Sequence, residues 1–197
     1  RLFNKGVVDL TRTVALTGSE VKQTGYYNML VGTELGKLFA DNVNGKGNLR
    51  YISGNVLTGT RIEAEGVLRA THSQLTVIPE GDDVHEAFGW ASLSPKRYSA
   101  GATYLKLKKA YRLDARLLGG PRAIIVSNEY DKVFPLDIFP EQLIKSTLAF
   151  NIDKMEQLGI YEVAPEDFAL CEFVDTSKLE LQRIVRTGLD MLRKEME

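Results

Sequence analysis

Alternating apolar and polar residues in the first eighty positions predict a small sheet. Val8, Leu10, Arg12, Val14 and Leu16 alternate with polar neighbours such as Thr11 and Thr13, which predicts a first strand that ends at a turn. Residues 26–31 give a second strand, and the short connection between the two predicts a hairpin. Residues 49–53 and 75–78 are short, largely apolar runs bounded by turn residues, and they predict two further strands.

One short helix is expected between the second and third strands. Thr33 is a candidate N-cap, because its hydroxyl can accept a hydrogen bond from a free backbone N–H at the helix start. Leu35, Leu38 and Phe39 follow at helical spacing and give one apolar face, and the helix ends before Asn42. The resulting order of elements, β-β-α-β-β, predicts a β-grasp sheet.

Helical periodicity takes over in residues 131–197. One helix begins near Pro140, which suits a first-turn position, and a second covers 153–158 and ends at Gly159. Pro165 opens a third, and a long amphipathic helix runs from Leu179. The predicted apolar faces are Leu143, Ile144, Thr147 and Leu148 on the first helix and Leu181, Ile184, Val185, Leu189, Leu192 and Met196 on the last. These elements predict a four-helix bundle.

We therefore expect an α+β chain with three regions: a β-grasp domain in residues 1–83, a mixed connecting segment in 84–130 and a helical bundle in 131–197. The connecting segment holds one predicted buried strand, residues 122–126. Residues 1–130 carry 17 Lys/Arg and 12 Asp/Glu, whereas residues 131–197 carry 8 and 14. This asymmetry indicates two modules with different surfaces, or else chance variation in solvated faces.

Length and composition set outer limits. The 197 residues can bury a substantial core, and 44% hydrophobic with 26% charged residues is ordinary for a soluble globular protein. No apolar run reaches the roughly 18 residues that a membrane helix needs. The first residues form no signal peptide, and the missing initial Met suggests a fragment or a processed chain. The single cysteine excludes an internal disulfide and fits a reducing compartment.

A basic stretch in residues 96–116 is the first candidate for a binding surface. It contains Lys96, Arg97, Lys106, Lys108, Lys109, Arg112 and Arg116 against a single acid, Asp114. A solvated face, a contact with another subunit and a lipid-headgroup contact are all open interpretations, but nucleic acid is not favoured because no recognition motif accompanies the charge. His72 and His85 have no cysteine or histidine at zinc-ligand spacing, so neither a metal site nor a catalytic residue is predicted.

The stretch around the only cysteine has the spacing of an iron–sulfur loop without its ligands. Ferredoxin-type loops use C-x2-C-x2-C-x3-C. With Cys171 as the third ligand, the other three positions fall on Pro165, Phe168 and Asp175. A cluster needs about four thiolates. The sequence therefore predicts a degenerate cluster loop in which Cys171 is a small buried apolar residue.

Several motifs in order along the chain carry a family resemblance. Residues 14–27 resemble the soluble-ligand-binding β-grasp signature, with Thr24 where that signature has proline. Further matching motifs are Tyr51-Ile52-Ser53-Gly54-Asn55-Val56-Leu57-Thr58-Gly59, Phe88-Gly89-Trp90, Pro135-Leu136-Asp137-Ile138, Gln157-Leu158-Gly159 and residues 166–174. Together they resemble the C-terminal half of NqrA, a subunit of the Na+-translocating NADH:quinone reductase.

The resemblance implies a β-grasp module followed by a helical domain like the [4Fe-4S] domain of the flavin-binding subunit of respiratory complex I and of the Rnf C subunit, with the cluster lost. It implies a peripheral subunit on the cytoplasmic side of the bacterial inner membrane, with integral membrane subunits as partners and quinone as a candidate ligand. NADH, flavins, iron–sulfur and quinone are then cofactors of the whole complex and not of this chain. The alternatives are a stand-alone β-grasp ligand-binding or scaffold protein and an Rnf-type electron-transport subunit.

Overall fold

The computed structural model describes residues 2–45, 47–82, 98–100, 104 and 110–197. These form two compact units. Of the described residues, the sheet unit contains 2–45, 47–82, 98, 104 and 110–116, and the helical unit contains 99–100 and 117–197. The Phe88-Gly89-Trp90 motif, His85 and the basic residues Lys96, Arg97, Lys106, Lys108 and Lys109 lie outside the described residues.

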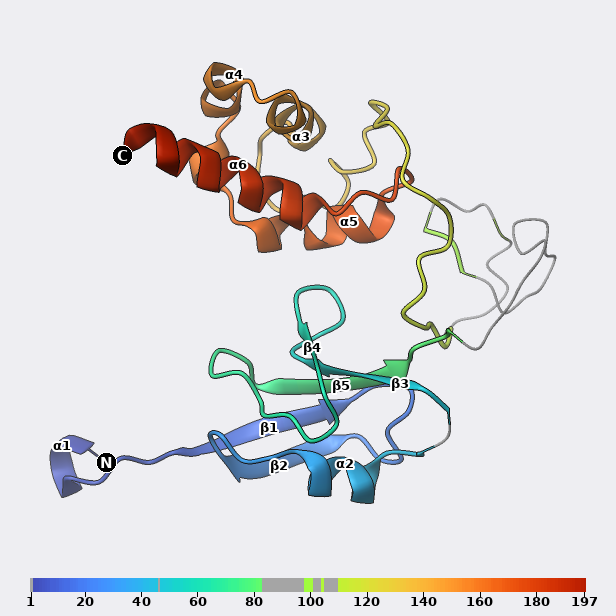
Figure 1. Cartoon of the computed structure of the whole chain (residues 1–197), viewed down its shortest axis with the longest axis vertical. Helices are drawn as coiled ribbons and strands as arrows, with labels where there is room; N and C mark the ends of the chain where they lie inside the picture. Colours follow the sequence, from blue (N-terminus) through green and yellow to red (C-terminus); the bar gives the residue numbers. More distant parts are fainter. Residues whose placement is uncertain (1, 46, 83–97, 101–103, 105–109) are drawn as a thin grey trace. The chain divides into compact units, whose positions relative to one another are not determined.

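The sheet unit is built on one five-stranded mixed sheet (Figure 1). The strands are β1 (Thr11–Thr17), β2 (Gly25–Leu30), β3 (Leu49–Ser53), β4 (Thr60–Ile62) and β5 (Gln74–Pro79), preceded by a single helical turn, α1 (Leu2–Lys5). Their order across the sheet is β2-β1-β5-β3-β4. The central pair β1 and β5 is parallel and the other pairs are antiparallel. This arrangement, with one helix after the first hairpin, fits the predicted β-grasp sheet, but β4 is a fifth strand that the predicted order β-β-α-β-β lacks.

One helix, α2 (Gly36–Asn42), packs on the sheet. Its buried residue Phe39 joins a core that also contains Leu35, Val14 and Leu16 from β1, and Leu75 and Val77 from β5. The first strand leaves the sheet at Gly18, whose φ is +119° and where an added Cβ would lie 2.0 Å from the carbonyl oxygen of Val77. Only glycine fits this close approach of the two central strands.

Two sheet-unit boundaries differ from those predicted. β1 begins at Thr11, so Val8 and Leu10 are exposed residues ahead of the strand. The helix begins at Gly36, and Thr33 does not cap it. The N–H of Thr33 donates to Leu30 O in a turn, and the N–H of Leu35 donates to Gly66 O. These hydrogen bonds hold residues 33–35 outside the helix, so the helix starts only after them.

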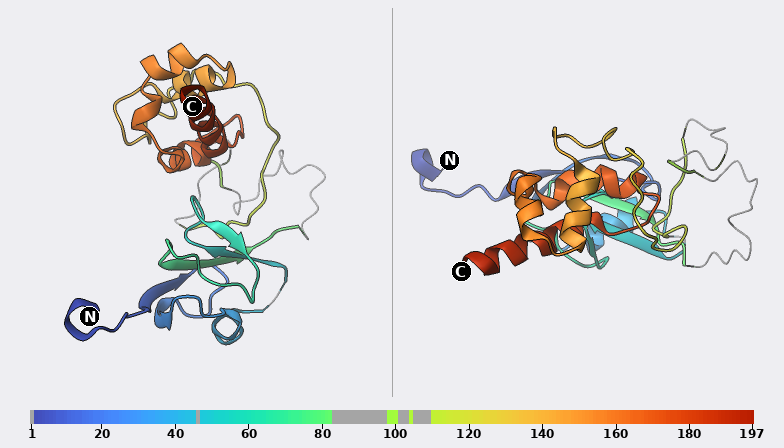
Figure 2. Two further views of the ribbon diagram at one scale, coloured as in Figure 1. Left: turned by 60° about the vertical axis from the view of Figure 1, so that its left-hand side comes forward. Right: turned by 90° about the horizontal axis from the view of Figure 1, so that it is seen from above.

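The helical unit consists of short helices around one longer one (Figure 2). They are α3 (Pro140–Leu148), α4 (Ile152–Gln157), the 3-10 turns η2 (Ile160–Glu162) and η3 (Pro165–Phe168), α5 (Ala169–Val174) and α6 (Leu181–Met196). The predicted helix starts at Pro140 and Pro165 and the predicted stop at Gly159, with φ of +85°, are confirmed. α6 packs against η3, α3 and α5 through Leu181, Val185 and Leu192.

Three predictions for the helical unit were wrong in detail. Residues 122–126 form no strand, because the N–H of Arg122 donates to Ser177 O in an irregular segment and the side chains of Ile125 and Val126 are exposed. Leu148 and Met196 are exposed because each is the last residue of its helix.

Among the described helices, none combines the length and the hydrophobicity needed to cross a membrane.

The end of α3 holds an exposed aromatic residue in a left-handed conformation. Phe150 has φ of +53°, and the residue is 67% exposed. Its N–H donates to Thr147 O and the N–H of Asn151 donates to Ser146 O, which is the Schellman pattern that usually places glycine at this position. A side chain there is strained by roughly 1–2 kcal/mol.

Phe150→Gly should therefore raise the unfolding free energy by about 1 kcal/mol. Urea unfolding followed by circular dichroism measures this change. The matched control is Ala149→Gly, because Ala149 has φ of −83° and glycine there should destabilise the helical unit. A loss of stability in the Phe150 variant would mean that the ring makes a stabilising contact.

Candidate functional site

The four degenerate cluster positions all lie in one buried part of the helical unit. Pro165 and Phe168 belong to η3, Cys171 to α5, and Asp175 is the residue at which α5 ends. All four are buried. The turn that begins this stretch is fixed by its own sequence, since the Asp167 carboxylate accepts a hydrogen bond from the N–H of Ala164 at 2.8 Å.

Phe168 fills its position with hydrocarbon. Its side chain is 0% exposed, and its ring centroid lies 4.7 Å from that of Phe134 in a tilted pair. It belongs to the core cluster that also includes Met155 and Ile160. A phenyl ring has no donor atom for iron, so this position stabilises the unit by packing.

Cys171 is held as an inert thiol. It is fully buried on the inner side of α5, and its Sγ lies 3.9 Å from the carbonyl oxygen of Tyr130. Burial, with a smaller effect from the negative charge of Asp131, raises the pKa of the Cys171 thiol to about 12. The thiolate is the form that binds metals, and the raised pKa makes this form scarcer at neutral pH.

Asp175 uses both carboxylate oxygens to order the loop between α5 and α6. Its Oδ1 accepts from the N–H of Ser177 at 2.9 Å and its Oδ2 from the N–H of Leu179 at 2.8 Å. Its own N–H donates to the carbonyl oxygen of Cys171 at 2.8 Å. The carboxylate that could in principle have ligated iron is thus engaged with backbone.

Two buried polar residues next to these positions were not predicted as part of the site. Glu141, in the first turn of α3, accepts from Ser127 N at 3.1 Å and from Ser127 Oγ at 3.1 Å. Tyr130 is buried, and no described atom satisfies hydrogen-bond geometry with its hydroxyl. Burial and then the nearby Asp175 carboxylate raise the pKa of Tyr130. No periodicity marks these residues, because they lie in or bind an irregular segment.

The motif at residues 51–59 is a tight turn whose own side chains hold it. Asn55 Oδ1 accepts from the N–H groups of Leu57 and Thr58, each at 2.8 Å. A Cβ on Gly59 would lie 2.3 Å from Asn55 O, so glycine is required there. β3 lies before this turn and β4 after it.

Ser53, at the start of this turn, contacts the described histidine. Its Oγ lies 2.9 Å from His72 Nδ1 and accepts from the N–H of Arg69 at 3.1 Å. Because Ser53 is fully buried, it is no nucleophile for an external substrate. Within the described part of the chain, no three His, Cys, Asp or Glu side chains are placed to hold a metal ion.

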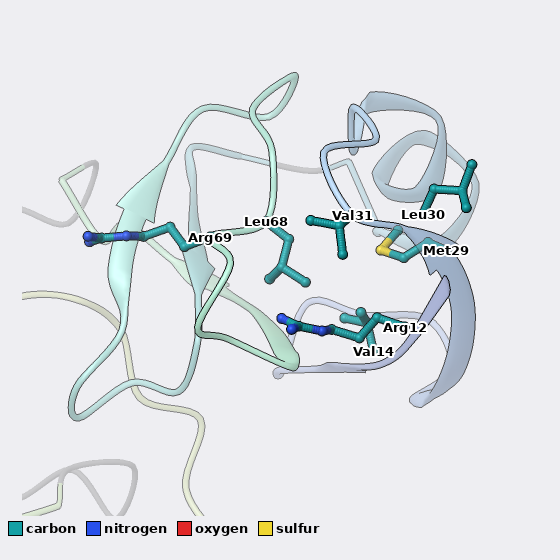
Figure 3. Close-up of a pocket in the computed structure, with 7 residues that line it drawn as sticks. All are labelled: Arg12, Val14, Met29, Leu30, Val31, Leu68 and Arg69. Atoms are coloured by element: carbon teal, nitrogen blue, oxygen red, sulfur yellow. The ribbon is translucent and has the colours of Figure 1, made fainter. Parts of the chain in front are cut away.

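A small hollow beside β1 and β2 is one further feature of the sheet unit that could receive a ligand (Figure 3). It is lined by Arg12, Val14, Met29, Leu30, Val31, Leu68 and Arg69. Arg12 donates to the carbonyl oxygens of Ala70 and His72. Arg69 points away from the hollow and donates to Thr60 Oγ1 at 2.7 Å. The hollow is therefore mainly apolar, and its cationic groups already bind protein oxygens.

Comparison with known proteins supports the predicted resemblance. Residues 13–64, which span β1 to β4, match the family model described as the NQRA C-terminal domain. The chain is 36% identical to the NqrA subunit of the Na(+)-translocating NADH-quinone reductase of Serratia proteamaculans over 98% of its own length. The NqrA proteins of Shewanella frigidimarina and Neisseria meningitidis are 33% and 34% identical over 99% of it. The chain is similar to NqrA along almost its whole length.

The similarity to NqrA covers both the sheet unit and the helical unit. The chain spans 44% of the length of each of these curated relatives. The description of the matching family model agrees with the prediction that this chain corresponds to the C-terminal part of NqrA.

The buried thiol gives a direct prediction, because the chain has one cysteine. Iodoacetamide should label Cys171 in the native protein at pH 8 roughly a thousandfold more slowly than in urea, since a raised pKa depletes the thiolate and burial blocks access. Mass spectrometry of timed samples measures both rates. Equal rates would show a reactive, accessible cysteine and contradict the described packing.

Proposed function

We propose that this chain is the C-terminal part of a peripheral subunit of a Na+-translocating NADH–quinone reductase. It would lie on the cytoplasmic side of the membrane, dock on integral subunits and carry no cofactor. The observation that supports this proposal most strongly is similarity to NqrA along almost the whole chain, through both units. The three regions 1–83, 84–130 and 131–197 are the proposed organisation of this part.

The packing of the helical unit supports the cofactor-free proposal. In a working cluster loop, four thiolates would converge on iron. Here Pro165 and Phe168 offer hydrocarbon, the Asp175 oxygens bind backbone N–H groups, and Cys171 is a neutral buried thiol. We infer that the helical unit descends from a [4Fe-4S] domain and keeps its architecture through side-chain packing.

In this proposal, electron transfer from NADH to quinone runs through the flavins and iron–sulfur centres of other subunits, and sodium export is coupled to it there. The chain supports the quinone-reducing end of the complex as a folded, non-redox element. Quinone is a proposed ligand of the complex.

The alternatives are less well supported by the same observations. An Rnf-type electron carrier would need cluster thiolates, which residues 165–175 do not supply. A stand-alone β-grasp protein would account for the family match in residues 13–64, but not for similarity that continues through α3 to α6.

Recovery from membranes tests the proposed function. The full-length protein that contains this chain, carrying an affinity tag, should bring down integral subunits of the reductase from detergent-solubilised membranes in about equal amounts. Recovery of the tagged protein alone, from the soluble fraction, would contradict the proposal.

A second test uses the cysteine in the assembled reductase. Cys171→Ala should leave NADH–quinone turnover within about twofold of the parent complex, because a thiol that carries no electrons contributes only packing, while the melting temperature falls slightly. Steady-state turnover per assembled complex is the measurement. Loss of turnover in a complex that assembles normally would assign Cys171 a redox role.

A further inference from the structure

Asn44 is the one asparagine of the chain that is followed by glycine. An Asn-Gly pair can cyclise, because the backbone nitrogen after the asparagine can attack the side-chain amide carbon and close a five-membered ring. Glycine favours this step, since it has no Cβ beside the attacking nitrogen and its backbone reaches conformations that are closed to other residues. Hydrogen bonds to the amide or to the attacking N–H slow the reaction, so the fold decides whether such a pair reacts.

The structure leaves both reacting groups of this pair open. Asn44 and Gly45 are exposed in the segment between α2 and β3, and Gly45 has φ of +61°. Neither the Asn44 side-chain amide nor the Gly45 N–H makes a hydrogen bond to any described residue. The N–H of Asn44 itself donates to Glu20 O at 3.0 Å. The main chain is therefore anchored just before the two groups that react.

Asn42, two residues earlier, shows the opposite arrangement. Its Oδ1 accepts from the hydroxyl of Tyr27 at 2.8 Å, and its Nδ2 donates to Leu38 O at 2.9 Å. The N–H that would attack, that of Val43, donates to Phe39 O at 2.9 Å. Val43 is also buried and β-branched, so its bulk hinders ring closure. Asn42 is thus a built-in control for a reaction at position 44.

We propose that Asn44 is a site of spontaneous deamidation through a succinimide. The Gly45 nitrogen bonds to Asn44 Cγ, the bond between Cγ and Nδ2 breaks, and Nδ2 leaves as ammonia with the proton of the Gly45 N–H. Water then opens the ring at one of its two carbonyls. Opening at the Cγ carbonyl gives aspartate, and opening at the main-chain carbonyl gives isoaspartate, whose main chain runs through the former side chain.

The product places a negative charge in a hollow that already holds an ion pair. The residues that line this hollow are Ser19, Glu20, Asn44 and Arg112. Arg112 Nε donates to Glu20 Oε1 at 2.7 Å. Either product adds a second carboxylate beside this pair, and isoaspartate also lengthens the main chain next to the bridge between Val21 and Val43. The modification therefore changes both the charge and the backbone at one defined position of the sheet unit.

Timed incubation of the full-length protein that contains this chain, at neutral pH and physiological temperature, tests the proposal. Trypsin cleaves after Lys37 and Lys46, so one peptide carries both Asn42 and Asn44. Mass spectrometry of this peptide should show conversion at Asn44 about tenfold faster than at Asn42, or more, with isoaspartate and aspartate both present. In urea the rate at Asn44 should stay within about threefold of the native rate, because the fold does not protect this pair.

Two variants check the ring-closing step. Asn44→Gln should show no conversion over the same period, because its amide would have to close a larger ring. Gly45→Ala should slow conversion at Asn44 about tenfold, and an added Cβ at position 45 meets no atom within 4 Å. Circular dichroism melts verify that both variants are folded.

Three results would each overturn the proposal. The first is conversion at Asn44 that is slower in the native protein than in urea by more than about threefold, which would mean that the fold protects the pair. The second is conversion at Asn42 as fast as at Asn44. The third is aspartate without isoaspartate, which would mean direct hydrolysis of the amide without a ring.

Discussion

A buried carboxylate at the end of α5 holds the helical unit together. Asp175 receives the N–H groups of Ser177 and Leu179, which lie in the loop that leads into α6, while its own N–H closes α5 on Cys171. Backbone groups buried in such a loop need partners, and without Asp175 these donors would be unsatisfied at a cost of about 1–3 kcal/mol each. The direction in which α6 leaves this loop, and hence the packing of Leu181 and Val185, depends on it.

A second buried carboxylate, that of Glu141, accepts hydrogen bonds from the irregular segment before α3. Glu141 accepts from the backbone and hydroxyl of Ser127, and Ser177 Oγ donates to the carbonyl oxygen of Ala123 at 3.2 Å. Phe134, at the end of this segment, brings its ring against Phe168. In a redox domain of this kind, a metal cluster would hold the interior together. Here hydrogen bonds to two buried carboxylates and aromatic packing do so, which supports the proposed non-redox role.

Periodicity predicted the parts of this fold that obey a regular repeat. The alternation in β1, the short apolar run in β5, the helical spacing in α3 and α6, the start at Pro140 and the stop at Gly159 are local signals, and the structure follows them. Thr33 misled the prediction because a turn hydrogen bond to Leu30 O wins over a cap. Residues 122–126 form a short apolar run, and such a run alone does not reveal whether another strand lies beside it to accept and donate backbone hydrogen bonds. The strand predicted there was therefore wrong. Tyr130 and Glu141 could not be recognised in advance, since their burial depends on contacts between segments distant in sequence.

The iron content of this chain is the most direct measure of the proposed non-redox role. The full-length protein, purified anaerobically and incubated with ferrous iron, sulfide and thiol reductant, then desalted, should retain no stoichiometric iron or acid-labile sulfide and show no visible charge-transfer absorption. Retention of about four iron and four sulfide per chain, with a reducible paramagnetic signal, would mean that residues 165–175 hold a working cluster and would contradict that role.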